Sequence, residues 1–190
     1  MKQLIRSFAI AALLVLAGVG SAAAQQQQAP PPSKFKLMSS AFGDGSPIPT
    51  QYSCADPNAT SPALSWSNPP AAAMSFALIM HDPEGAPQKG SMDVTHWILW
   101  NISANSTSLM GNVKPDSSPE GLVQGKNVRG VNGYQPPCPP PGAVPHHYTF
   151  ELYALDTKLD LPAGSARADL LKAMDGHVVG KTAYIGLFGR

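Results

Sequence analysis

Residues 130–156, GVNGYQPPCPPPGAVPHHYTFELYALD, contain the features that decide the fold. The first half is rich in proline, and each proline fixes φ at about −65° and removes a backbone N–H, so this loop has little conformational freedom. The second half, Tyr148–Leu155, interleaves polar residues with aromatic and aliphatic ones, as a half-buried strand does. His146 and His147 lie at the junction. A rigid loop that leads into a core strand can fix a polar group at the mouth of a pocket, so we interpret this stretch as half of a site.

Further strands are predicted along the chain. Met74–Met80 and Thr95–Ile102 are continuous apolar runs, which are typical of buried strands. Weaker strand patterns cover residues 35–42, 61–66 and 182–187, whereas residues 105–133 are mostly loop. Short strands separated by long Gly- and Pro-rich loops predict a mainly β fold, a β-sandwich of antiparallel sheets with peripheral helices.

One of these helices is predicted near the C-terminus. Ser165 is a candidate N-cap, because its hydroxyl can accept a hydrogen bond from an unpaired amide of the first turn. Leu170, Leu171 and Met174 supply one apolar face, and Gly176 is placed as a C-terminal stop.

The first 24 residues have the order of a secretory signal peptide. Lys2 and Arg6 precede the apolar run Phe8–Val19, and small residues then lead to Ala24. The alternative is a membrane anchor, but the run is shorter than the roughly 20 residues that a span needs. We therefore predict cleavage after Ala24, no membrane span in the cleaved protein, and a periplasmic or secreted location.

Residues 25–33 form a low-complexity Gln/Pro tether, which has too little apolar area to fold, and residues 34–190 form one domain. Without the signal peptide the chain has 11 basic against 12 acidic residues and a net charge of about −1. This composition provides no basic surface for nucleic acid and no polybasic patch for a membrane.

Two cysteines, Cys54 and Cys138, remain in the exported chain. A disulfide between them is the simplest expectation for an oxidising compartment. Two buried thiols are the alternative, because sequence spacing does not show whether the two Cα atoms approach each other. A zinc site that uses both thiols and a histidine has no typical metal-ligand spacing behind it.

Three residues share a position where a buried strand meets a Pro- or Gly-rich loop: Asp82, His96 and His146. If their strands are neighbours, the three side chains converge at one rim of the sandwich. One carboxylate with two imidazoles could hold an anionic oxygen and keep the rings oriented. Each residue taken alone is more often structural. Strand alternation would turn His81 and His147 away from their neighbours.

Two blocks, HDPEGAPQKGSMDVTHWILWNI (81–102) and residues 130–156, resemble the signature regions of the phosphatidylethanolamine-binding protein family, specifically its bacterial Raf-kinase-inhibitor-like branch. The similarity runs from about Phe35 to Arg190 and consists of several ordered motifs in series. It implies a small β-sandwich with a pocket for phosphate-like head groups. The branch resemblance is also compatible with a homodimer.

The resemblance, together with the residue pattern, assigns these ligand-binding residues: Asp82, Pro83, Pro87, His96, Gly133, Tyr134 and His146. The chain departs from the family pattern in three places. The segment 82–87 has one residue more than the usual Asp-Pro-x-Ala-Pro. Pro136 replaces a common glycine and removes an amide donor, and His147 stands where the family often has arginine.

The predicted function is an exported, non-catalytic protein that binds a small anionic or phosphorylated ligand, without a metal or other cofactor. One alternative is a hydrolase that uses the Asp–His pair as general base or metal ligands, although no G-x-S-x-G, H-E-x-x-H or P-loop motif occurs and Ser91 has no evident base. The other is a kinase-inhibitor-like modulator of an unknown protein partner, as the family name suggests.

Overall fold

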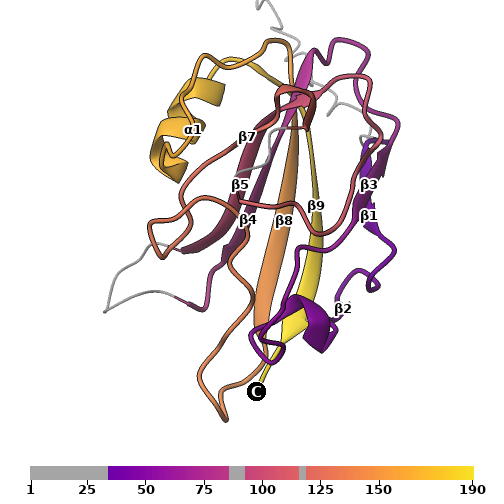
Figure 1. Ribbon diagram of the computed structural model, residues 1–190. Helices are drawn as coiled ribbons and strands as arrows, with labels where there is room; N and C mark the ends of the chain where they lie inside the picture. Colours follow the sequence, from indigo (N-terminus) through magenta and orange to yellow (C-terminus); the bar gives the residue numbers. More distant parts are fainter. Residues whose placement is uncertain (1–33, 86–92, 116–118) are drawn as a thin grey trace, which may run out of the picture. The chain divides into compact units, whose positions relative to one another are not determined.

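Two β-sheets form the described part of the chain, which comprises residues 34–85, 93–115 and 119–190 of the computed structural model (Figure 1). The larger sheet has the strand order β2-β9-β8-β4-β5-β7, and the smaller has the order β1-β3-β6. The strands are β1 (Lys36–Ser39), β2 (Ser46–Pro47), β3 (Leu64–Ser67), β4 (Ser75–Asp82), β5 (Val94–Ser103), β6 (Ser108–Leu109), β7 (Val123–Gln124), β8 (His146–Leu155) and β9 (Val178–Phe188).

The described residues also include the helix α1 (Arg167–Met174) and two short 3₁₀ turns, η1 (Thr50–Tyr52) and η3 (Pro119–Gly121). They belong to one compact unit, Pro32–Arg190. The predicted signal peptide and tether lie outside the described residues, as do Ala86, Pro87 and Ser91.

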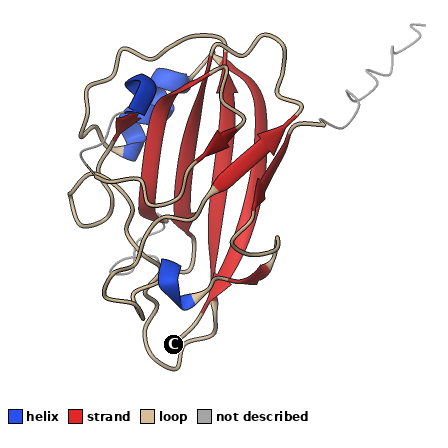
Figure 2. Ribbon diagram, turned by 45° about the vertical axis from the view of Figure 1, so that its right-hand side comes forward, coloured by secondary structure: helices blue, strands red, loops and turns tan. Residues whose placement is uncertain are grey.

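The two faces of the large sheet bury different apolar clusters, because successive side chains of a strand point to opposite faces. On one face, Phe76 of β4, Trp97 of β5 and Phe150 of β8 pack with Leu37 and Trp66 of the small sheet. The views in Figures 1 and 2 show how the small sheet lies across the long central strands. The predicted mainly β sandwich is confirmed.

The other face of the large sheet packs against α1. Ala77, Ile79 and Ile98 of the sheet form a cluster with Leu170 and Met174 of the helix. Leu170 and Met174 are four positions apart and therefore lie on one side of the helix. Leu171, which we placed on the same face, is 42% exposed because it lies one position further around the helix.

Both ends of α1 can be compared with the prediction. The N-cap is Ala166 rather than Ser165, whose hydroxyl donates to the carbonyl of Pro162. Alanine has no side-chain acceptor, and the helix start is held instead by the Asp169 carboxylate, which accepts the Ala166 N–H at 3.0 Å. The predicted stop is confirmed, since Gly176 follows the helix with φ of 80°.

The sheets are antiparallel with one exception, because the two-residue strand β2 runs parallel to the end of β9. β4 extends through His81 and Asp82, and β8 begins at His146, so the candidate polar residues belong to the strands themselves. β9 starts at Val178, four residues before the predicted strand.

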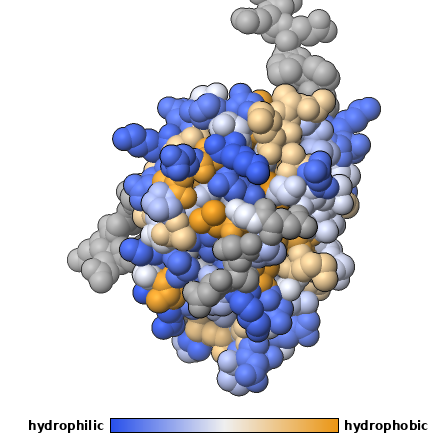
Figure 3. Space-filling model, turned by 45° about the horizontal axis from the view of Figure 1, so that its top comes forward, coloured by the Kyte–Doolittle hydropathy of each residue, from blue (hydrophilic) through white to orange (hydrophobic). Residues whose placement is uncertain are grey.

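The surface in Figure 3 is mostly hydrophilic, with apolar residues in small separate groups. None of the described helices is both long and apolar enough to cross a membrane.

Candidate functional site

Asp82, His96 and His146 come together at one end of the sandwich interior. They lie on β4, β5 and β8, and β4 pairs with both of the other strands. All three residues are buried, with exposed fractions of 3%, 5% and 8%. The structure thus places the three residues that the sequence pattern singled out on one face of three adjacent strands.

Strand alternation explains two of these positions. On β4, Leu78 and Met80 face the core between the sheets, so Asp82 points the same way two residues later. On β8, Phe150 and Tyr148 face that core, and His146 continues the series. The sequence pattern therefore predicts their direction correctly.

His96 owes its direction to a β-bulge. Met80 pairs with Trp97, but the next residue, His81, pairs with Thr95, so His96 is an extra residue on β5. Without the bulge, alternation from the core residue Trp97 would turn His96 to the opposite face. Bulges redirect side chains in this way and are common beside functional sites.

The Asp82 carboxylate is held by three hydrogen bonds. Its Oδ1 accepts the amides of Glu84 and Gly85, both at 2.9 Å, and its Oδ2 lies 2.8 Å from Nδ1 of His146. Pro83 forms the turn between these groups and is itself exposed. Since a carboxylate only accepts, Nδ1 of His146 is the donor, and Nε2 is the nitrogen that remains for a ligand.

His96 is fixed by the proline-rich loop. Its Nδ1 lies 2.8 Å from the carbonyl oxygen of Gln135, and the Gln135 amide donates back to the His96 carbonyl at 2.8 Å. Burial lowers the pKa of His96, and this outweighs the Gln135 hydrogen bond and the nearby Asp82 charge, which raise it. This ring is therefore harder to protonate than a free imidazole.

A pocket of about 370 Å³ opens between these residues and the loop. Its described lining residues are Asp82, Glu84, Gly85, Val94, His96, Val128, Arg129, Gln135, Pro136, Cys138, Pro139, Pro140, His146 and Tyr148. Pro87, which the family pattern added, lies outside the described residues.

Tyr148 is a pocket residue that the sequence reasoning missed. Its ring stacks near His146 and meets His96 edge-on, with ring centroids 5.1 Å apart in the second case. The buried hydroxyl interacts with the Asp82 carboxylate and the Cys138 backbone, although neither contact has full hydrogen-bond geometry. Burial raises the pKa of Tyr148, and the neighbouring Asp82 charge raises it further, so the hydroxyl stays a donor. Strand alternation from His146 could have identified this residue.

Tyr134 and Gly133 do not line this pocket. The Tyr134 hydroxyl donates to the carbonyl of Tyr52 at 2.7 Å, and its ring packs edge-on against Trp97. Gly133 has φ of 99°, and a side chain there would meet Pro115 at 3.1 Å. Tyr134 and Gly133 therefore support the proline-rich loop without lining the pocket.

A disulfide anchors the same loop. Cys54 and Cys138 are bonded, with Cα atoms 5.3 Å apart, and the Cys54 amide donates to the Pro137 carbonyl. The disulfide expectation is confirmed over free thiols and over a zinc site. Arg190 holds the far end of the loop, since its Nε donates to the Pro139 carbonyl at 2.9 Å.

Opposite charges stand at the pocket mouth. The Glu84 carboxylate accepts both the amide and the ring Nδ1 of His147, at 3.0 and 2.7 Å. Although burial acts to raise the pKa of Glu84, these hydrogen bonds lower it. Arg129 is an exposed residue of the same lining and supplies the cation, which sequence reasoning did not single out.

A model of the family described as phosphatidylethanolamine-binding protein matches residues 38–189. This chain belongs to the phosphatidylethanolamine-binding protein family. It is 49% identical over 156 residues to the UPF0098 protein of Methanothermobacter thermautotrophicus, covering 81% of this chain and 98% of that protein.

Two further family members are similar over most of the domain. The crystal structure of E. coli YbcL, described as a member of the mammalian PEBP family, superposes with a TM-score of 0.75 and 30% identity, covering 83% of this chain and 99% of YbcL. LppC of Mycobacterium tuberculosis, which is named as a lipoprotein, is 37% identical over 80% of this chain and 71% of its own length.

The outer face of the large sheet carries a separate charged cluster in this family member. His81 lies 2.6 Å from Asp93, and Lys181 lies 2.6 Å from Glu151. Arg167 of α1 completes the cluster through a 3.3 Å contact with Asp93. As alternation predicts, His81 faces away from the pocket.

Three side chains of the pocket offer potential metal-ligand atoms that lie close together. One donor atom from each of Asp82, Glu84 and His146 lies within 4.8 Å of the others. These side chains already bond to one another or to His147, so the cluster is satisfied as a hydrogen-bond network without a metal.

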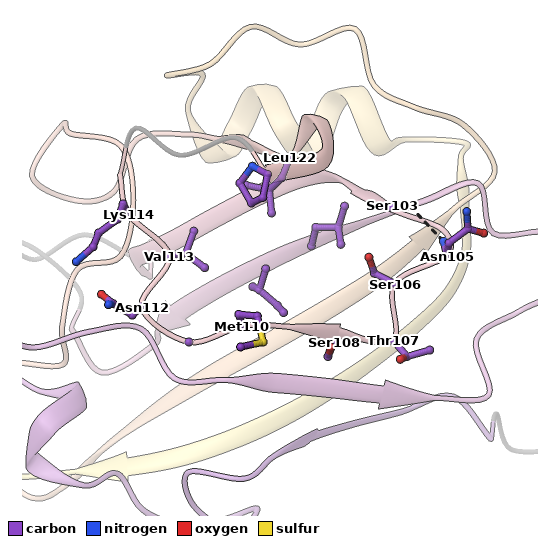
Figure 4. Close-up of a pocket in the computed structure, with 14 residues that line it drawn as sticks. Ser103, Asn105, Ser106, Thr107, Ser108, Met110, Asn112, Val113, Lys114 and Leu122 are labelled. Atoms are coloured by element: carbon purple, nitrogen blue, oxygen red, sulfur yellow. Dashed lines mark hydrogen bonds between the residues drawn. The ribbon is translucent and has the colours of Figure 1, made fainter.

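A second pocket, of about 620 Å³, is lined by most residues of the segment 102–114 together with Pro119 and Leu122 (Figure 4). Serine, threonine and asparagine side chains line its rim, and Lys114 is the one charged residue among its described lining residues. Because it gathers neither a carboxylate nor an imidazole, we take the smaller pocket as the candidate site.

Proposed function

We propose that this family member is an exported, non-catalytic binding protein whose smaller pocket holds a phosphate-like anion. The observation that carries the proposal is the convergence of Asp82, His96, His146 and Tyr148 on one pocket of about 370 Å³. Pockets of roughly 300–1,000 Å³ with a few convergent polar groups are typical small-molecule sites. The proline-rich wall and the disulfide limit the entropy that is lost on binding.

The charges support an anion as ligand. Arg129 at the mouth attracts anions, and the Tyr148 hydroxyl offers a buried donor inside the pocket. Asp82 fixes the His146 ring, so that Nε2 meets a ligand in a set orientation. The family description, phosphatidylethanolamine-binding, is consistent with a phosphate-bearing ligand.

The lining supports binding rather than catalysis. The described lining residues include no serine or threonine, and the Cys138 sulfur is committed to the disulfide. The remaining catalytic route would be general-base activation of water by the Asp82–His146 pair, which a turnover assay can test.

Three observations support export. The N-terminal residues have the order of a signal peptide, and a disulfide persists in an oxidising compartment. A relative that is 37% identical, LppC, is named as a lipoprotein. An exported protein does not meet a cytosolic kinase of its own cell, so we propose a small ligand rather than a kinase as the partner of the pocket.

Calorimetric titration of the purified mature protein with inorganic phosphate at pH 5.5 and 7.0 tests this proposal. We expect saturable binding, tighter at pH 5.5 and weakened tenfold or more by His146→Ala. His177→Ala is the matched control, because His177 is exposed and pairs with Asp156 away from the pocket. Absence of binding at both pH values would refute the anion proposal. Turnover of phosphate or carboxylic esters that is lost in His96→Ala would replace it with a hydrolase.

A further inference from the structure

We infer that the Cys54–Cys138 disulfide is a redox switch of the pocket: a dithiol reductant attacks the Cys138 sulfur, and the reduced protein holds its anion more weakly. The switch deepens the proposed function and rests on it. Cys138 is then a modification site, and the partner is defined by its chemistry as a dithiol. The position of Cys138 in the pocket wall carries the inference.

The two cysteines differ in exposure. Cys138 is exposed and belongs to the lining of the pocket, whereas Cys54 is half-buried and follows η1. Access helps to decide which sulfur a thiolate attacks, and exposed disulfides are typically the labile or regulatory ones. A reductant that approaches from the pocket therefore meets the Cys138 sulfur first.

The exchange takes two steps and needs no other reactant. One thiolate of the dithiol attacks the Cys138 sulfur, the S–S bond breaks, and the electron pair leaves on the Cys54 sulfur, which takes up a proton. The second thiol of the reductant then displaces Cys138 from the mixed disulfide. The dithiol is oxidised to a disulfide, and both protein cysteines are reduced to thiols.

The pocket wall depends on this bond because its backbone offers few donors. Residues 136–141 are Pro-Pro-Cys-Pro-Pro-Pro, so Cys138 carries the single amide N–H of this segment. The Cys138 backbone interacts with the buried Tyr148 hydroxyl. The same residue is therefore bonded to Cys54 and in contact with a hydroxyl that we assign to the ligand.

Weaker links remain in the wall after reduction. The Cys54 amide donates to the Pro137 carbonyl at 3.0 Å, and Nε of Arg190 donates to the Pro139 carbonyl at 2.9 Å. These hydrogen bonds restrain the segment less than a covalent bond does. The reduced wall consequently loses more conformational entropy when a ligand orders it, and the affinity falls.

The core of the domain is built without the disulfide. Neither cysteine is among the described residues of the two apolar clusters that cover the faces of the large sheet. Asp82, His96 and His146 lie on strands that pair through backbone hydrogen bonds. Reduction therefore changes the pocket wall and leaves the sandwich folded.

Reduction and ligand binding are coupled in both directions. If the oxidised protein binds phosphate more tightly than the reduced protein by some factor, saturating phosphate makes the disulfide harder to reduce by the same factor. We expect this factor to be at least about fivefold, the lower end of typical coupling between two sites.

The experiment compares oxidised and reduced mature protein at pH 7.0. Equilibrium dialysis with radiolabelled inorganic phosphate gives the two affinities. Mixtures of reduced and oxidised dithiothreitol, with and without saturating phosphate, give the ratio of the two dithiothreitol forms at which half of the protein is reduced. We expect phosphate affinity to fall at least about fivefold on reduction, and phosphate to raise that ratio by the same factor.

The matched control is the double variant Cys54→Ser with Cys138→Ser. Its phosphate affinity should equal that of the reduced wild-type protein, and dithiothreitol should not change it. A loss of affinity in dithiothreitol that the double variant shares would place the effect outside the disulfide and overturn the switch.

The outcomes separate the switch from the function on which it rests. Equal phosphate affinity of the oxidised and reduced proteins overturns the switch and leaves an anion-binding function. A reduced protein that unfolds as a whole, seen as loss of near-UV circular dichroism, also overturns it, because the disulfide then acts on stability alone. Failure of the oxidised protein to bind phosphate overturns the proposed function and the switch together.

Single variants test which sulfur is attacked, without any ligand. Cys54→Ser leaves the Cys138 thiol free, and Cys138→Ser leaves the Cys54 thiol free. We expect an aromatic disulfide reagent to react severalfold faster with the Cys138 thiol, because Cys138 is the more exposed of the two. Equal rates, or a faster reaction of Cys54, would overturn the assignment of the attack to Cys138.

Discussion

Two tyrosines beside the pocket illustrate how differently single residues use the same hydroxyl. The Tyr134 hydroxyl donates a hydrogen bond to the Tyr52 carbonyl, and this bond connects the proline-rich loop to η1. Tyr148 keeps its hydroxyl buried within the pocket wall, beside the Asp82 carboxylate and the Cys138 backbone, in contacts that lack full hydrogen-bond geometry. A donor held by such weak contacts can turn to a ligand at little cost in free energy.

Replacing each tyrosine with phenylalanine should therefore give opposite results. Tyr148→Phe removes the donor that faces a ligand, and a hydrogen bond to a charged group contributes about 1.5–3 kcal/mol, so phosphate affinity should fall tenfold or more. The free energy of unfolding of the Tyr148→Phe variant should hardly change. Tyr134→Phe should lower the free energy of unfolding by about 1 kcal/mol and leave phosphate affinity unchanged. Calorimetry and urea unfolding of both variants check this, and equal effects on affinity would contradict the placement of Tyr134.

At the scale of elements, the pocket lies between three paired strands and one loop that is cross-linked by a disulfide. The strands carry Asp82, His96 and His146, and the loop closes over them through Gln135 and Cys138. The disulfide joins residues 84 apart in sequence, so it constrains a long segment of the unfolded chain.

Removing the cross-link with Cys54→Ser and Cys138→Ser together should lower the free energy of unfolding by about 2–4 kcal/mol. Phosphate affinity should fall as well, because the loop without its cross-link loses more conformational entropy when it binds the ligand. Urea unfolding and calorimetry measure the two effects. Wild-type affinity in a destabilised double variant would show that the hydrogen bonds of Gln135 and Arg190 position the loop without the disulfide.

The elements also show what the sequence could and could not predict. Alternation along β4 and β8 predicts that Asp82 and His146 face the same side of the sheet. It also predicts correctly that His81 faces the other side. His96 was placed at the right rim, but the bulge that aims it inward depends on strand register, which one sequence does not reveal. The roles of Tyr134 and Tyr148 were not separable either, because they depend on which carbonyl lies within reach of each hydroxyl.

At the scale of the whole molecule, the sandwich separates two polar clusters on opposite faces of one sheet. The inner cluster forms the pocket. The outer cluster of His81, Asp93 and Glu151 links α1 to the sheet through Arg167 and bonds Lys181 of β9. The domain carries a net charge near zero, which agrees with the small ligand that we propose.

The export prediction also belongs to the whole chain. If the signal peptide is processed, the protein should be recovered from the periplasmic or extracellular fraction with Gln25 as its first residue. Intact-mass spectrometry of that fraction would show the loss of residues 1–24 and of two hydrogens for the disulfide. A full-length protein that stays with the membrane fraction would contradict cleavage.

The contacts of Arg190 have a practical consequence. Its carbonyl accepts the Gly142 amide and its guanidinium donates to Pro139, so the last residue of the sequence supports the loop that forms the pocket wall. A purification tag or fluorescent fusion attached after Arg190 would begin beside that wall. Titrations are better carried out on protein tagged before Lys34. A fusion after Arg190 would alter the affinity of the pocket for its ligand.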